Sequence, residues 1–234
     1  MKICLLQIRE EKKELDFERK SFLRSLGISA EELASIDFFA DGTKDGVASA
    51  DALIIGGSKY GVAKNDSGLM VPKLEELVKI IKVALAKNIP ILGICFGHQL
   101  LTRVCGGEVI RDDASKEYGT REMKLLPAAK NDPLFGHLPE KFNAQSAHHD
   151  RVEALPSGAE ILIKSRLCPV QACRIGANVY GVQFHPERSK EDYEEILKYR
   201  FKDSGQPEWA DTLAPSPEAE TIMKKFADMV RVAE

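Results

Sequence analysis

Short apolar runs alternate with longer amphipathic segments through the first half of this chain. Four mostly apolar runs have the length of a strand: residues 2–8, 36–39, 52–55 and 89–94. Residues 15–26 and 72–87 instead repeat apolar side chains every three or four positions, as helices with one buried face do. Strands that are apolar on both faces lie in a sheet that is covered on both sides. The pattern therefore predicts an α/β fold with a mostly parallel central sheet and helices on both faces.

The second half of the chain is richer in extended segments. Five of them are predicted as strands: residues 122–126, 143–147, 161–164, 170–174 and 179–184. Helices are expected from Ser189 to about Lys202 and from Pro217 to Val232. Between them lies a loop rich in Pro, Gly and Asp that contains the single tryptophan, Trp209. We expect one domain over residues 1–234, with a loop and C-terminal helix extension at about 203–234.

Three polar segments are interpreted from their place in this pattern. Asp41–Gly46, rich in Gly and Asp, predicts a turn. Lys59–Met70 predicts a loop that borders a pocket, because loops at the carboxyl ends of parallel strands carry ligand contacts, and Tyr60 and Asn65 are its candidate contacts. The charge run at Glu10–Glu14 predicts a solvated face.

Composition excludes several classes of partner. With 33 basic and 36 acidic residues and a formal net charge of -3, the chain has no electrostatic footprint for nucleic acid or an anionic membrane. Its first apolar run is too short for a signal peptide, and no later run approaches membrane-spanning length. Its five cysteines have no paired metal-type spacing. We expect a cytoplasmic protein with reduced thiols and no metal or other cofactor.

A cysteine stands where the run at residues 89–94 ends. Gly93 and Gly97 lie two residues on either side of Cys95, and the sequence that follows has a helical period. A sharp strand-to-helix turn holds its central residue in an uncommon backbone conformation, and flanking glycines leave room for it. The positive end of the helix favours a thiolate there. Cys95 is therefore a candidate nucleophile, and the alternative is a buried free cysteine that packs as a small hydrophobe.

Two further segments carry the groups that a cysteine nucleophile needs. A thiolate that attacks an amide requires a base for the leaving amine and a carboxylate that orients the base. His185 and Glu187, two residues apart on a segment expected to be extended, leave the backbone on the same face. The backbone at Gly57, after the strand at 52–55, can approach a substrate carbonyl. The N–H groups of Gly57 and Phe96 are thus a candidate oxyanion hole.

These three motifs resemble those of the class I, triad-type glutamine amidotransferases. The nucleophile motif Gly-x-Cys-x-Gly-x-Gln is matched at residues 93–99, the His/Glu motif at residues 181–187 and the oxyanion strand at residues 55–57. The resemblance spans roughly residues 1 to 200 and implies a flavodoxin-like sheet with a nucleophile elbow. It also implies a Cys-His-Glu triad of Cys95, His185 and Glu187, with a thioester intermediate.

The resemblance also suggests which residues hold the substrate. In this family the positions of Gly56 and Gln99 help to hold the glutamine moiety. The segment at residues 145–150 resembles the family's Ser-His-x-Asp segment, which makes His148 a further candidate, although Ala147 stands where serine is expected. A metal site at the adjacent pair His148 and His149 is disfavoured, because neighbouring strand residues point to opposite faces.

Three functions compete on this basis. One is a free-standing enzyme that hydrolyses glutamine or another γ-glutamyl compound, like a branch of the family that includes plant γ-glutamyl peptidases. Another is the ammonia-supplying amidotransferase subunit of a two-chain GMP synthetase-like complex, and the third is a non-catalytic regulatory homologue. We expect a small-molecule substrate, and leave a synthase partner and a homodimer open. His98 and Cys105 are interpreted as packing residues, and the loop around Trp209 as a cover of the catalytic face, a partner contact or a plain surface excursion.

Overall fold

The computed structural model describes residues 1–40, 45–65 and 71–232. In these residues, nine strands form one sheet in the order β2-β1-β3-β4-β11-β10-β9-β6-β7. Their bounds are β1 Ile3–Gln7, β2 Leu33–Asp37, β3 Ala52–Ile55, β4 Ile91–Ile94, β6 Glu117–Leu125, β7 Lys141–His148, β9 Ala159–Lys164, β10 Ala172–Ile175 and β11 Val179–Val182. The helices are α1 Lys12–Leu26, α2 Asp45–Ala48, α3 Leu74–Ala86, α4 Phe96–Val104, α5 Lys190–Arg200 and α6 Pro217–Val232, with 3-10 turns η1 Pro127–Ala129 and η2 Glu208–Thr212.

The sheet has a parallel half and an antiparallel half. Strands β2, β1, β3, β4 and β11 run parallel to one another, in the strand order of a doubly wound fold. Strands β10, β9, β6 and β7 continue the sheet in antiparallel pairs. The expected flavodoxin-like architecture is confirmed, and the later strands extend the sheet as the resemblance implied.

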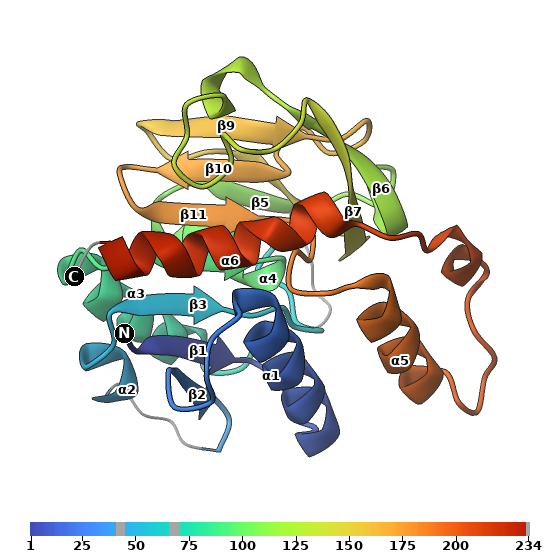
Figure 1. The fold of residues 1–234 in the computed structure, drawn as a ribbon, viewed down its shortest axis with the longest axis horizontal. Coiled ribbons are helices and arrows are strands. Elements are labelled where there is room, and N and C mark those ends of the chain that lie inside the picture. The colour runs from blue at the N-terminus through green and yellow to red at the C-terminus, as the bar shows by residue number, and fades with distance from the viewer. Residues whose placement is uncertain (41–44, 66–70, 233–234) are drawn as a thin grey trace.

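Helices cover both faces of the parallel half, as predicted (Figure 1). One core contains Phe22 of α1 and Phe226 of α6 with the side chains of β1 and β3 that point to that face. The other contains Ile81 of α3 and Leu100 of α4 with the alternate side chains of the same strands. Because both faces are buried, the strands need no polar alternation, which explains their continuous apolar runs.

Several element bounds differ from the prediction. The second strand ends at Asp37 instead of Phe39, because the Asp37 carboxylate accepts hydrogen bonds from the N–H groups of Phe39 and Ala40 and turns the chain. The helix expected from residue 15 begins at Lys12, and the helix expected from Pro72 begins at Leu74 after a left-handed residue, Lys73.

A small second sheet was not predicted. Strands β5 (Glu108–Arg111) and β8 (Asp150–Ala154) pair with each other, antiparallel, outside the main sheet. Both are short and polar, so neither has a clear strand pattern of its own. The predicted turn at Asp41–Gly46 and loop at Lys59–Met70 lie partly outside the described residues, which resume at Asp45 and Val71.

The parallel strands place four loops at one edge of the sheet. Arg9 follows β1, Gly57 follows β3, Cys95 follows β4 and His185 follows β11. Parallel neighbours end at the same edge, where open α/β sheets bind their ligands. The carboxyl edge of the sheet is therefore where the candidate site has to be sought.

Candidate active site

Cys95 lies at a sharp turn between β4 and α4. Its φ of 53° and ψ of -103° are an uncommon conformation for a residue with a side chain. The turn is held by the Cys95 N–H, which donates to Val182 O at 2.7 Å, and by Gln99 N–H, which donates to Cys95 O at 3.1 Å. The sequence-predicted nucleophile elbow is thus present in the backbone.

The flanking glycines are required by close packing. A Cβ on Gly93 would lie 2.5 Å from the backbone of Gly97, and a Cβ on Gly97 would lie 2.3 Å from the Ile55 carbonyl oxygen. On β11, a Cβ on Gly181 would lie 2.1 Å from Nδ1 of His98, which is fully buried. At these glycines, helix α4 therefore lies closer to strands β3, β4 and β11 than a side chain would allow. His98 is a packing residue, as predicted.

His185 and Glu187 form a buried pair beside the elbow. Nδ1 of His185 lies 2.7 Å from Oε1 of Glu187, and the Glu187 side chain has no exposed surface. The expected contact is present, but the segment is not extended: β11 ends at Val182, and Arg188 N–H donates to His185 O across a turn. Pro186 cannot donate to a strand ladder, which is consistent with the turn.

The charges of this pair fix the tautomer of the imidazole. Although its burial opposes ionisation, His185 and Arg188 keep the pKa of Glu187 below its usual value. Burial lowers the pKa of His185 against the pull of Glu187. An ionised Glu187 accepts the Nδ1 proton of a neutral His185, so Nε2 of the ring is left to accept a proton.

The surroundings of the Cys95 sulfur disfavour a thiolate. Burial, and then the Glu187 carboxylate, raise its pKa to about 12, against the opposing effect of Arg9. The N–H of Phe96 at the helix start lowers the thiol pKa, in the expected direction, but the removal of the sulfur from water raises it by more. Sγ lies 3.8 Å from Ala147 O and 3.6 Å from Nε2 of Gln183. Among the contacts of the described residues, there is no hydrogen bond between Sγ and the His185 ring.

Gly57 lies beside Cys95 and His185, at the end of β3. The N–H of Gly56 is committed to Leu6 O at 3.1 Å, so the next N–H, that of Gly57, is the first beyond the ladder. A Cβ on Gly57 would lie 3.1 Å from Cε1 of His185 and 3.8 Å from Cβ of Cys95. The backbone N–H of Phe96 also acts on the Cys95 sulfur, since it lowers the thiol pKa. Gly57, after β3, and Phe96, at the start of α4, thus both lie close to Cys95.

We expect Gly57→Ala to reduce turnover by about tenfold with little change in Tm, because the new methyl group displaces the His185 ring and the Arg9 guanidinium by tenths of an ångström. Steady-state kinetics and a thermal melt on the same preparation check this. Turnover within a few-fold of wild type would show that the space in front of Gly57 is not needed.

The residues predicted to contact the substrate already have hydrogen-bond partners within the chain. Gln99 lines the cleft, but its Nε2 donates to Asp150 O and to Oε1 of Gln183, both at 3.0 Å. The His148 ring is fully buried, with Nδ1 3.2 Å from Asp150 O and Nε2 3.3 Å from Glu117. Gly56 faces Glu18, whose Oε1 would lie 2.8 Å from a Cβ there. Both ring nitrogens of His148 are thus paired inside the protein, and the space in front of the Gly56 Cα is filled by Glu18.

The cleft around Cys95 has two connected parts. A cavity of about 170 Å³ is lined by Cys95 and His185 together with Trp209, Tyr118 and Arg200. A wider hollow of about 410 Å³ is lined by Cys95, Gln99 and residues of the 147–150 segment. Of the loop candidates, Tyr60 borders the wider hollow, whereas Asn65 pairs with the backbone of Arg111.

Trp209 covers the catalytic face. Its ring stacks on Tyr118 with centroids 5.2 Å apart and meets the edge of Tyr193 at 6.1 Å. These contacts favour a cover over a plain surface excursion, and a partner contact stays a prediction.

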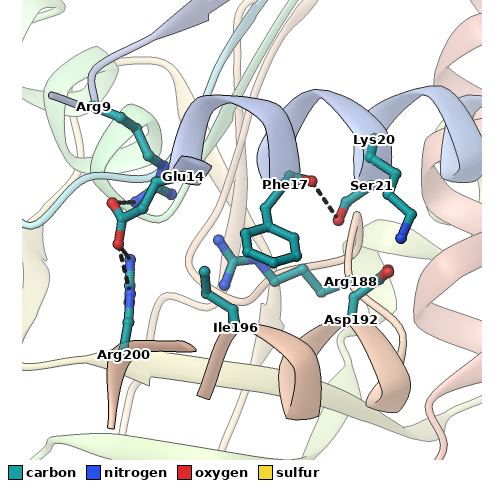
Figure 2. A pocket seen from close by; sticks show the side chains of 9 residues that line it. All are labelled: Arg9, Glu14, Phe17, Lys20, Ser21, Arg188, Asp192, Ile196 and Arg200. Carbon is teal, nitrogen blue, oxygen red and sulfur yellow. Dashed lines mark hydrogen bonds and ion pairs between the residues drawn. The ribbon is translucent and has the colours of Figure 1, made fainter. Parts of the chain in front are cut away.

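Sequence reasoning missed the charged groups behind the cleft. Arg9 and Glu18 form a buried ion pair with a 2.8 Å contact, and Glu14 lies between Arg9 and Arg200 (Figure 2). The charge run at residues 10–14 is mostly solvated, as predicted, but Glu14 turns inward. A signal existed in the helical spacing of Glu14 and Glu18, which places both on one face of α1.

No cluster of three or more His, Cys, Asp or Glu side chains in residues 1–40, 45–65 and 71–232 is arranged to hold a metal ion. Within the same ranges, no helix is both long and apolar enough to cross a membrane.

A doubly wound sheet with a cysteine at a strand-to-helix elbow and a His/Glu pair after the neighbouring strand defines an amidotransferase-like α/β protein. The family model for glutamine amidotransferase class-I matches residues 35–203. The chain belongs to the class-I glutamine amidotransferase family.

Relatives with a stated activity are similar over part of the chain. A glutamine-hydrolysing GMP synthase subunit of Methanocaldococcus jannaschii is 43% identical over 129 residues, which cover 54% of this chain and 66% of the relative. The protein of the same name from Pyrococcus abyssi is 37% identical over 152 residues, covering 62% and 79%. The chain thus spans about two thirds of the length of the first of these relatives.

Solved structures share the fold over nearly the whole chain. A glutamine amidotransferase from Thermotoga maritima has a TM-score of 0.76 at 19% identity, covering 98% of this chain and 97% of that one. A protein from Thermoplasma acidophilum, described as a GMP synthase subunit, has a TM-score of 0.70 at 21% identity, covering 100% and 95%. At these identities the likeness concerns the fold alone.

Proposed function

We propose that this protein hydrolyses a γ-glutamyl amide through a thioester on Cys95, with His185 as the proton-transfer group and Glu187 as the residue that orients it. The observation that carries the proposal is the buried 2.7 Å contact between His185 and Glu187, on the same cavity as the elbow cysteine. The intact set of three groups counts against a non-catalytic homologue.

The proposed reaction begins with a neutral Cys95 thiol and a neutral His185 imidazole. As Sγ attacks the γ-carbonyl carbon, the thiol proton passes to Nε2 of His185, and the carbonyl oxygen becomes an oxyanion near Gly57 and Phe96. Collapse of the intermediate breaks the C–N bond, and His185 returns the proton to the leaving amine. Water, deprotonated by His185, then cleaves the thioester and releases glutamate with the free thiol.

The size and lining of the cavity beside Cys95 favour a substrate larger than glutamine. Ammonia needs little room as a leaving group, whereas about 170 Å³ lies beside the sulfur, walled by aromatic rings including Trp209. Its described lining also includes Arg200 and Lys59 and no carboxylate. These features suit a γ-glutamyl peptide or amine conjugate.

We expect the isolated protein to hydrolyse a γ-glutamyl peptide or amine conjugate at least about tenfold faster in kcat/KM than glutamine, a difference of ~1.4 kcal/mol. Trp209→Ala should remove most of this preference and leave glutamine hydrolysis within a few-fold, because only the larger leaving group reaches that ring. Glutamate release from both substrates measures it, with Leu167→Ala, an exposed and remote change, as the control. Equal kcat/KM values in the wild type would contradict the preference.

The second candidate is the ammonia-supplying component of a two-chain GMP synthetase-like complex. The observation in its favour is the name of the relatives, which are glutamine-hydrolysing GMP synthase subunits. Such a component typically stays slow until its synthase docks. If the isolated protein is inactive on every γ-glutamyl substrate and turns over glutamine only with ATP and an added synthase chain, the free-standing hypothesis is rejected in favour of this candidate.

A further inference from the structure

A buried ion pair lies directly behind the oxyanion turn. Nε and Nη2 of Arg9 both donate to Oε1 of Glu18, at 3.0 and 2.8 Å, and the two side chains are only 4% and 1% exposed. The second Glu18 oxygen accepts from Nε2 of Gln7 at 3.1 Å, and the same Gln7 amide donates to Leu15 O at 2.9 Å. The guanidinium is therefore held in one place by β1 and α1.

The pair packs against both glycines of the turn. Oε1 of Glu18 lies 2.8 Å from the position of a Cβ on Gly56, and Nη2 of Arg9 lies 3.3 Å from the position of a Cβ on Gly57. That second position is also 3.1 Å from Cε1 of His185 and 3.8 Å from Cβ of Cys95. One point in front of Gly57 is thus surrounded by the guanidinium, the imidazole and the nucleophile.

The charge of Arg9 acts on the catalytic groups. Arg9 opposes the rise in the pKa of the Cys95 thiol that burial and Glu187 cause, and Arg188 acts in the same direction. The other titratable side chains on the cavity are His185, Tyr118 and Tyr193, with Lys59 and Arg200 on its rim. Arg188 pairs with Glu187, whereas Arg9 is the buried cation that lies next to the position in front of Gly57.

We propose that Arg9 is a positioning residue of the catalytic site: held by Glu18, its guanidinium fixes the Gly56-Gly57 turn and supplies a fixed positive charge beside the sulfur of Cys95. This inference rests on the proposed function, in which that sulfur and an oxyanion near Gly57 both become negative. A cation that is already desolvated and oriented stabilises such charge without reorganisation. The two-donor contact with Glu18 requires the planar fork of arginine.

The test is the rate at which iodoacetamide alkylates Cys95, followed by mass spectrometry at a pH below the thiol midpoint. There the rate follows the thiolate fraction, so a rise of about one pH unit in the midpoint slows alkylation about tenfold. We expect Arg9→Met to show this loss. Glu18→Gln removes a negative charge instead and should speed alkylation, while turnover falls because the turn loses its support.

Opposite signs for the two variants separate charge from packing. A merely structural pair would loosen the site in both variants and move both alkylation rates in the same direction. Arg9→Lys restores the charge without the fork, so we expect alkylation within about threefold of wild type but turnover still reduced about tenfold. Arg174→Met is the matched control and should leave the alkylation rate unchanged, because Arg174 lies on β10, away from the cavity, and pairs with the buried Asp132.

Removing one partner leaves a buried charge unpaired, so a single variant can fail to fold. The double variant Arg9→Met with Glu18→Gln avoids this, and we expect near wild-type alkylation with low turnover. A folded Arg9→Met protein, judged by its melt, with unchanged alkylation and turnover would overturn the inference. Absence of labelling at Cys95 in the wild type would instead overturn the proposed function, so the two failures are distinguishable.

Discussion

Cys95→Ala is expected to abolish hydrolysis of glutamine and of every γ-glutamyl substrate, with a loss of at least about 10⁴-fold in kcat. Without the sulfur no thioester forms, and the remaining groups can only polarise the carbonyl. Folding should be retained, because the side chain is small and the elbow is held by backbone contacts of Cys95 with Val182 and Gln99. Glutamate release, measured beside a thermal melt, checks both statements.

The other thiols provide the matched controls. Cys173 is buried beside His98, and Cys105 is partly buried near the end of α4, so neither lies on the cleft. Cys105→Ala should keep wild-type turnover. Activity of Cys95→Ala within a few-fold of wild type would remove Cys95 from the mechanism.

The second large effect concerns His185 and Glu187. His185→Ala should reduce kcat nearly as far as Cys95→Ala, because no other described side chain on the cavity takes the thiol proton. Glu187→Gln should retain roughly ten to a hundred times more activity than His185→Ala, since the imidazole still samples the required orientation. The effects should not add, so the double variant should be no worse than His185→Ala. Steady-state kcat values for the three variants test this.

A specific reversal would contradict the assignment of roles. If Glu187→Gln were as inactive as Cys95→Ala while His185→Ala remained active, the carboxylate and not the imidazole would carry the proton. Arg188 adds a useful control, because its Nε donates to the same Glu187 oxygen at 3.2 Å without contacting the His185 ring nitrogens. Arg188→Lys should therefore leave the ratio between the two variants unchanged.

The parts of the site that are local in sequence were predictable. The elbow at Cys95 shows itself within five residues through Gly93 and Gly97, and the His185–Glu187 contact within three. The strand Ala52–Ile55 and the helix Pro217–Val232 were predicted with the bounds that the structure has. Apolar period and glycine spacing act over a few residues, so a single sequence displays them.

Other parts depend on contacts between distant segments. Strands β5 and β8 pair across some forty residues, and neither has an apolar pattern that predicts the other. Arg9 and Glu18 look like ordinary surface charges in the sequence. They are buried because Gly56 and Gly57, which have no side chains, leave space beside the turn.

The position of Trp209 and the state of the Cys95 thiol also lay beyond the sequence. The loop at residues 203–217 carries no signal for where it packs. It is held by the rings of Tyr118 and Tyr193 around Trp209 and by hydrogen bonds of Thr120 and Gln145 to Ala214. The helix start near Cys95 was visible, but the extent of burial that outweighs it was not. Both depend on which side chains surround a point in space.

Acylation of Cys95 by the γ-glutamyl group is the central step of the proposed reaction. Trapping the acylated enzyme is its most direct test. The protein is mixed with a γ-glutamyl peptide, quenched in acid during turnover, digested and analysed by mass spectrometry. We expect a γ-glutamyl adduct on the peptide that contains Cys95. Hydroxylamine should remove it, and it should be missing from Cys95→Ala digested in the same way. Two results would contradict acylation of Cys95. One is turnover with the adduct on Cys4, Cys105, Cys168 or Cys173. The other is turnover with no adduct on any cysteine, under conditions that trap a control thioester.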